Sequence, residues 1–172
     1  MRIININGPI NSGKSTVSKL LKQKLPESLF IEVDDLISDK EEIKLNLSRE
    51  EGWAERLKRL DKIIAQEKKL QRFKNVIFAY PMTGNLYYHW KLWEDENTEF
   101  INITLAPSIS ICLQNRGTRE LNEQEKERIK QMYDEGYHSS QFADLIIDNS
   151  RQTPPETLQH ILLHLKKYNQ EL

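Results

Sequence analysis

One stretch near the start of the chain limits its possible folds more than any other. Residues 8–16 read GPINSGKST and follow an apolar run typical of a buried strand. Gly8, Gly13, Lys14 and Ser15 have the spacing of a phosphate-binding loop, in which two glycines precede a lysine and a hydroxyl residue. Such a loop joins a strand to a helix, and a helical pattern follows here. The sequence therefore predicts an α/β fold with a nucleoside triphosphate site at this turn.

The residue types in this loop suit the binding of phosphate. Glycines allow a tight turn whose backbone N–H groups converge on one anion. The helix that begins near Lys14 directs its positive dipole end at the same place. We expect Lys14 to lie over the β- and γ-phosphates and the Ser15 hydroxyl to bind Mg²⁺. The predicted nucleotide-binding residues are Gly8, Asn11, Ser12, Gly13, Lys14, Ser15 and Thr16.

Short apolar runs alternate with helical patterns along the rest of the chain. This alternation predicts βαβ units and a mostly parallel sheet, and 172 residues suit one domain. The predicted strands are 2–7, 29–33, 75–80, 100–105 and 144–148. The predicted helices are 14–25, a long region over 36–72, then 85–93, 107–114, 122–135 and 154–167, the last capped by Thr153.

Composition favours a small-molecule ligand. The 25 Lys and Arg residues nearly balance 26 Asp and Glu residues, so we expect neither a general nucleic-acid surface nor a membrane surface. The single cysteine, Cys112, lies in an apolar stretch, which predicts a core residue. No signal-peptide core and no apolar run of about 18 residues is present, so a cytoplasmic location is expected. His138, His160 and His164 lack partners at metal-site spacing and stay unassigned.

Further motifs separate the classes of P-loop protein. A guanine-nucleotide switch needs Asn-Lys-x-Asp and Asp-x-x-Gly strings, and the chain has neither. A motor-type ATPase needs a mid-chain strand that ends in Asp-Glu. The nearest candidate, Asp148, closes the final predicted strand, so we interpret it mainly as a strand-end residue. These comparisons favour a small kinase.

A kinase needs a carboxylate near the acceptor hydroxyl. The stretch FIEVDDLI places Asp34 and Asp35 at the end of the second predicted strand, and ligands bind at the carboxyl ends of parallel strands. Because side chains alternate along a strand, only one of the two faces the site, and the other can cap the next helix. We expect a general base or magnesium partner here.

A kinase also needs cations over the transferring phosphoryl group. In QNRGTREL, Arg116 and Arg119 flank Gly117 between two predicted helices. Arginines that close over the γ-oxygens stabilise the transition state, and a glycine between them permits a hinge. This predicts a lid over about 115–123. The alternative is an exposed charged turn.

Together these features resemble the small P-loop kinases related to shikimate kinase, gluconate kinase, adenylyl-sulfate kinase and chloramphenicol phosphotransferase. The resemblance rests on the loop, VDDLI, the arginine pair and the closing ADLIIDNSRQTPPETLQHIL. It implies a three-layer P-loop fold with a five-stranded parallel sheet in order 2-3-1-4-5, helices on both faces, a small lid and an acceptor-binding region. It also maps the catalytic aspartate onto Asp34.

The chain departs from these relatives at two places. NVIFAYPMTGNLYYHW ends its strand in Tyr80 and Pro81, where many relatives have an acidic or glycine-rich segment. Magnesium would then depend on Ser15, Asp34 and water, or catalysis would be weak. Shikimate kinases carry two aspartates one residue apart near the second strand end, and Glu32 stands in place of the first.

The acceptor region is expected over about 36–74, which is longer than a plain crossover. Trp53, Leu57, Leu60 and Ile64 form one apolar helix face, which packs in the core or walls the cleft. The region's alternating charges make a nucleic-acid groove, as in a polynucleotide 5′-hydroxyl kinase, unlikely. An aromatic cluster after the third strand either packs on the sheet or lines a site for a drug-like, sugar or nucleoside acceptor: Tyr80, Thr83, Tyr87, His89 and Trp90.

The sequence thus predicts a kinase that uses ATP and Mg²⁺ to phosphorylate a hydroxyl of a small molecule. Lys14 and the loop would hold the phosphates, Ser15 and Asp34 the metal, Asp34 would act as base, and Arg116 and Arg119 would close from the lid. The alternative is a nucleotide-binding module with weak or no phosphotransfer. The acceptor, the choice between ATP and GTP, and the oligomeric state are left open.

Overall fold

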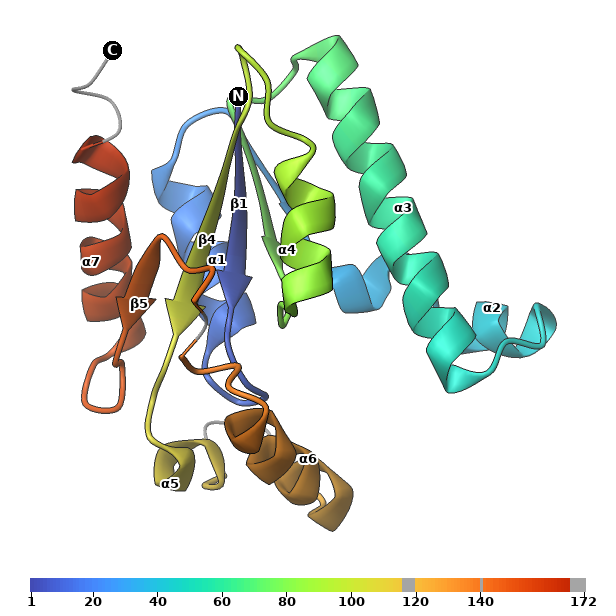
Figure 1. Ribbon diagram of the computed structural model, residues 1–172, viewed down its shortest axis with the longest axis vertical. Helices are drawn as coiled ribbons and strands as arrows, with labels where there is room; N and C mark the ends of the chain where they lie inside the picture. The colour runs from blue at the N-terminus through green and yellow to red at the C-terminus, as the bar shows by residue number, and fades with distance from the viewer. Residues whose placement is uncertain (116–119, 140, 168–172) are drawn as a thin grey trace.

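The computed structural model describes residues 1–115, 120–139 and 141–167. Its centre is a parallel sheet of five strands in the order β2-β3-β1-β4-β5 (Figure 1). The predicted fold class and strand order are confirmed. The strands are β1 (Arg2–Asn7), β2 (Ser28–Ile31), β3 (Asn75–Ala79), β4 (Glu99–Leu105) and β5 (Leu145–Ile147). The helices are α1 (Lys14–Lys24), α2 (Asp39–Lys44), α3 (Arg49–Leu70), α4 (Gly84–Lys91), α5 (Ile109–Cys112), α6 (Glu123–Asp134) and α7 (Pro154–Lys167), with a 3-10 turn η1 (Val33–Leu36).

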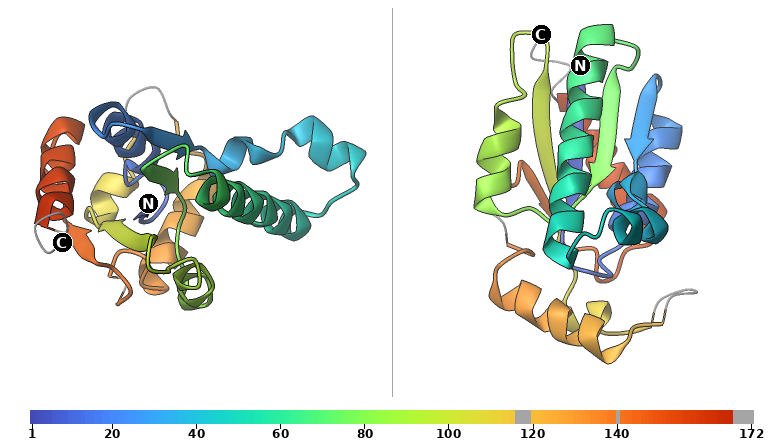
Figure 2. Two further views of the ribbon diagram at one scale, coloured as in Figure 1. Left: turned by 90° about the horizontal axis from the view of Figure 1, so that it is seen from above. Right: turned by 90° about the vertical axis from the view of Figure 1, so that its right-hand side faces the viewer.

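Helices cover both faces of the sheet. Helices α1 and α7 pack on one face, and α3 and α4 lie on the other (Figures 1 and 2). Alternate residues of β1 enter the two cores, because side chains alternate along a strand: Ile4 lies in the first core and Ile3 in the second. The buried apolar side chains around Trp90 fix α4 against the sheet. This three-layer arrangement holds the strand ends, and therefore the site, in place.

The long helical region predicted over 36–72 is divided into η1, α2 and α3. Ser38 begins α2 and Ser48 begins α3, and each hydroxyl accepts a hydrogen bond from a backbone N–H three residues later. Ser48 and Glu51 form a full capping box. The predicted region is helical but not continuous, because the side chains of Ser38 and Ser48 cap N-termini and so start new helices within it. The divided region gives the chain a separate short helix beside α3.

Two pairs of helices lie outside the three layers. Helices α5 and α6 lie beyond the carboxyl ends of the strands, while α2 and the start of α3 project sideways from the body (Figures 1 and 2). Cys112 at the end of α5 is fully buried, as predicted for a core residue. Within the described residues, no helix has the length and apolar character needed to cross a membrane.

Candidate functional site

The turn between β1 and α1 has the backbone geometry of an anion site. Gly8 has φ 141°, and a Cβ there would lie 2.5 Å from the carbonyl oxygen of Leu105. Gly13 adopts a left-handed conformation at the N-cap of α1 and offers no side-chain cap to the helix. The Lys14 ammonium folds back over the loop and donates to the carbonyl of Pro9 at 2.7 Å. A helix start without a side-chain cap, beside a folded-back lysine, fits a phosphate ligand.

Ser15, the hydroxyl residue of the loop, contacts the carboxylate of Glu32, a residue to which the sequence assigned no role. Ser15 Oγ donates to Glu32 Oε1 at 3.2 Å, across the ends of α1 and β2. Burial raises the pKa of the Glu32 carboxyl above its usual value, although the Ser15 hydrogen bond and the nearby Lys19 both lower it. A hydroxyl and a carboxylate side by side are oxygen ligands that suit Mg²⁺. The departure of Glu32 from the shikimate kinase pattern was the signal that could have found it.

The two consecutive aspartates lie on different surfaces. Asp35 lines a groove along the free edge of β2, together with Lys19 and Ile63. Asp34 contributes to the raised pKa of Tyr80, so the two side chains lie near each other at the strand ends, and Asp34 is exposed. Both aspartates lie in the 3-10 turn η1 after β2 and not on the strand, so strand alternation does not decide which of them faces a ligand, and the assignment of Asp34 stays a prediction.

Tyr80 follows β3 and lies near Asp34. Burial raises its pKa to about 12, helped by Tyr137 and Asp34 and opposed by Arg56. The Trp53 ring meets Tyr80 edge-on at 6.0 Å. The phenol therefore lies among residues from η1, α3 and the segment after α6. Tyr80 and Trp90 of the predicted aromatic cluster pack in the same core with their rings 5.9 Å apart, Trp90 fully buried and Tyr80 partly buried.

Two buried amides fix the segment that carries Tyr80. Asn5 bonds the Tyr80 backbone twice, accepting from its N–H and donating to its carbonyl, each at 3.1 Å. Asn7 Oδ1 accepts from the Met82 N–H at 2.8 Å. Both asparagines are fully buried in the central strand. Their side chains replace the backbone hydrogen bonds between strands where the chain leaves β3. Polar residues in a buried strand could have suggested this role, because buried polar groups need hydrogen-bond partners.

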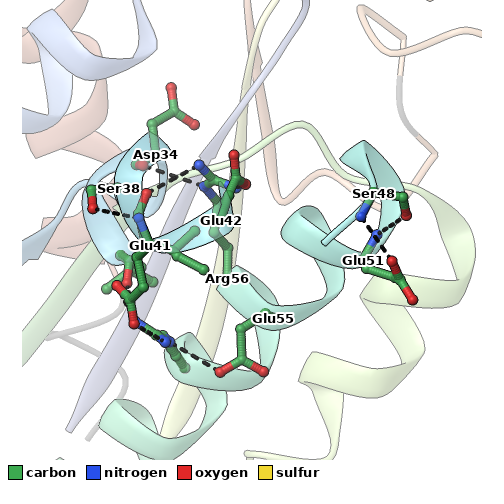
Figure 3. Close-up of polar contacts among 11 residues, drawn as sticks. Asp34, Ser38, Glu41, Glu42, Ser48, Glu51, Glu55 and Arg56 are labelled. Atoms are coloured by element: carbon green, nitrogen blue, oxygen red, sulfur yellow. Dashed lines mark hydrogen bonds and ion pairs between the residues drawn. The ribbon is translucent and has the colours of Figure 1, made fainter. Parts of the chain in front are cut away.

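A second set of contacts fixes the backbone of Asp34. Arg56 of α3 is buried and donates to the carbonyl oxygens of Asp34 at 3.3 Å and Ile37 at 3.1 Å, and it also bonds the Glu42 carboxylate (Figure 3). The Asp34 carboxylate points away from these contacts (Figure 3). The guanidinium therefore holds the backbone of the Asp34 turn and leaves the Asp34 carboxylate outside these contacts. Sequence spacing could not reveal this, because the partners are 14 to 22 residues apart.

A hollow of about 440 Å³ opens between the start of α4 and the segment after α6. Tyr137 belongs to its lining and also contributes to the raised pKa of Tyr80, so the hollow lies on the Tyr80 side of the strand ends. A volume of this size suits a small organic molecule. The lining residues are Met82, Thr83, Gly84, Glu135, Gly136, Tyr137, Ser139, Gln141 and Phe142.

The other residues singled out from the sequence have different outcomes. Arg116 and Arg119 fall outside the described residues, so the lid stays a prediction. Asp148 is engaged by Ser150 just after β5 and acts as a local turn residue. Asn149 donates to the Ser12 carbonyl at 3.0 Å, which ties the final loop to the phosphate loop. Within the described residues, no three His, Cys, Asp or Glu side chains form a metal-binding group.

Comparisons with known proteins agree with this geometry. No family model matches the chain. A shikimate kinase of Sulfurihydrogenibium sp. (strain YO3AOP1) is 27% identical over 172 residues, covering 97% of this chain and 99% of the relative. The resemblance to the small P-loop kinases is confirmed. Similarity along the full length supports a small-molecule kinase, that is, a phosphotransferase that acts on an alcohol group.

Solved structures share the fold under different names. The tunicamycin resistance protein of Deinococcus radiodurans matches with a TM-score of 0.64 at 16% identity, over 95% of each chain. A gluconokinase of Sinorhizobium meliloti 1021 also has a TM-score of 0.64 at 16% identity, over 98% of this chain and 93% of that chain. Since proteins with such different names share one fold, the fold does not identify the phosphoryl acceptor.

Proposed function

We propose that this protein transfers the γ-phosphoryl group of ATP to a hydroxyl group of a small molecule. The observation that carries the proposal is that Asp34 lies in the 3-10 turn η1, which follows β2, and near Tyr80. A carboxylate at that place can accept the proton of an attacking hydroxyl. The hollow behind Tyr137 gives the acceptor room.

Each part of the cleft has a role in this proposal. Bound ATP with Mg²⁺ supplies the phosphoryl group and neutralises part of its charge. Lys14 and the loop bind and orient the phosphates, and Ser15 with Glu32 would hold the metal. Asp34 takes the proton of the acceptor hydroxyl.

Two regions named from the sequence complete the proposal. The lid over about 115–123, with Arg116 and Arg119, would cover the phosphates and exclude water. The acceptor-binding region over about 36–74 would close the other side. The expected cytoplasmic setting supplies both ATP and Mg²⁺. In this proposal the whole chain, 1–172, acts as one kinase domain.

The test is release of ADP from ATP and Mg²⁺ by the purified protein, measured with and without a panel of hydroxylated compounds. The panel holds sugars, nucleosides, hydroxylated antibiotics and shikimate. Stimulation by one compound, with recovery of its phosphorylated form, supports the kinase. Tight nucleotide binding without stimulation by any compound would favour a nucleotide-binding module and contradict the proposal.

A further inference from the structure

Asn11 of the phosphate loop bonds a distant part of the chain through its side chain. Its backbone is left-handed, with φ 63°, a conformation that asparagine tolerates better than most residues. Its Nδ2 donates to the carbonyl oxygens of Cys112 and Gln114, each at 2.9 Å. These carbonyls lie at the end of α5, where backbone acceptors have no partner within the helix. The Asn11 amide therefore joins the phosphate loop to the end of α5.

Apolar packing strengthens the same junction. Ile10, the residue before Asn11, packs against a small core between α5 and α6. The buried members of this core are Cys112, Leu121 and Ile129. Tyr133 of α6 packs on the same core, and its hydroxyl donates to the carbonyl oxygen of Pro107, just before α5. Helices α5 and α6 thus form one unit, which the phosphate loop contacts through two consecutive side chains.

The unit of α5 and α6 leads directly into one wall of the hollow. Gly136 and Tyr137 follow α6 and line the hollow. Their N–H groups donate to carbonyl oxygens in the last turn of α6, at 3.1 and 3.0 Å. The other wall, which includes Met82 and Gly84, follows β3. A displacement of α5 and α6 would therefore move one wall of the hollow relative to the phosphate loop.

We propose that Asn11 is a positioning residue that aligns the acceptor with the phosphoryl group, because it fastens the unit of α5 and α6 to the phosphate loop. This inference rests on the proposed function and adds a residue that acts on it at a distance. The Asn11 side chain acts through the backbone of α5 and takes no part in the chemistry. Transfer needs the two reacting atoms closely aligned, so a looser junction lowers the rate of transfer more than the binding of either substrate.

The first test measures turnover with a compound that stimulates ADP release. Asn11→Gly keeps a residue that accepts the left-handed backbone and removes the amide. We expect kcat to fall by about tenfold or more, while the KM values for ATP and for the acceptor stay within about threefold. Asn97→Gly makes the same change in an exposed turn before β4, at the opposite end of the sheet, and should behave like the wild type. Full kcat in Asn11→Gly would overturn the inference.

The second test measures the junction itself and needs no acceptor. In Asn11→Gly, we expect amide hydrogen exchange at residues 112–114 and 131–134 to be about fivefold faster or more, with no change in Asn97→Gly. Asn11→Asp also tolerates the left-handed backbone but lacks the N–H donors, so it should show the same faster exchange. This second variant separates loss of the two bonds from the freedom of glycine. Unchanged exchange in both Asn11 variants would overturn the inference.

Binding of ADP with Mg²⁺ separates a lost alignment from a damaged loop. We expect its dissociation constant in Asn11→Gly to stay within about threefold of the wild-type value, because the loop amides and Lys14 remain. A larger rise would show that Asn11 serves nucleotide binding itself and would overturn the inference. If no compound stimulates ADP release by the wild type, the kinase proposal fails. The exchange and ADP measurements then still decide whether Asn11 fastens α5 and α6 to the loop.

Discussion

The nucleotide end and the acceptor end of the cleft are built in different ways. The phosphate loop joins β1 to α1, both of which are fixed by apolar cores, and its shape depends on backbone close to Gly8. The acceptor end depends on polar contacts between distant elements, and α2 has no buried residue at all. A loop set by local backbone geometry suits one ligand shared by many kinases. Contacts across the fold can change with few substitutions, which suits an acceptor that differs among relatives.

The largest effect should come from the nucleotide end. Lys14→Ala removes the ammonium over the phosphates, and we expect kcat/KM to fall by about 10²-fold or more because a charge-assisted contact to the transferring group is lost. Steady-state ADP release measures this. Lys22→Ala, an exposed change on the same helix, should behave like the wild type. Equal losses of kcat/KM in Lys14→Ala and Lys22→Ala would contradict a specific role for Lys14 at the phosphates.

At the acceptor end, Asn5→Leu should have the next largest effect. It removes both bonds to the Tyr80 backbone and leaves those buried groups without partners, at a cost of about 2–4 kcal/mol in unfolding free energy. The KM for the acceptor should rise more than the KM for ATP. Ile3→Val, on the same strand, tests for general loosening and should lower stability by about 1 kcal/mol without this split. A rise in both KM values alike would contradict a positioning role for Asn5.

A smaller effect is expected from Gly52→Ala. Alanine should stabilise a helix interior by about 1 kcal/mol relative to glycine. Here its Cβ would meet the Glu42 carboxylate, so we expect no stabilisation and a looser α2. Chemical denaturation together with amide hydrogen exchange in residues 39–44 measures both. A protein stabilised by the full amount would show that α2 is not held by this contact.

The smallest effect is a dependence on pH. Because the pKa of Glu32 is raised, its folded carboxyl binds a proton more readily than the unfolded one. The stability that this gives is present below the usual carboxyl pKa and is lost as pH rises through the raised value. Glu32→Gln should therefore modestly raise the melting temperature at pH 7, while raising the Mg²⁺ concentration needed for turnover. A lower melting temperature with unchanged Mg²⁺ dependence would contradict this account.

Local patterns made much of the fold predictable. The run from β1 through Lys14 to α1 was predicted because a strand, a glycine turn and a helix start each leave a short signature. The break at Ser48 was also local, since Ser48 and Glu51 have capping-box spacing, but the apolar periodicity obscured it.

The candidate site was only partly predictable. Strand alternation was applied to Asp34 and Asp35, but both residues lie in the 3-10 turn η1 beyond the end of β2. The bond between Ser15 and Glu32 and the pairing of Arg56 with Glu42 depend on how separate elements pack. No spacing rule within one element could give either contact. This is why the sequence predicted the nucleotide end in detail and the acceptor end only as a region.

The most direct test of the central claim compares two adjacent carboxylates. Asp34→Asn and Asp35→Asn make the same chemical change at adjacent residues of η1, of which Asp34 lies near Tyr80 and Asp35 lines the groove at the edge of β2. We predict that Asp34→Asn lowers acceptor-dependent kcat by 10²- to 10⁴-fold with nearly unchanged ATP affinity, whereas Asp35→Asn retains most activity. Full turnover by Asp34→Asn, or a larger loss in Asp35→Asn, would contradict the placement of catalysis beside Tyr80.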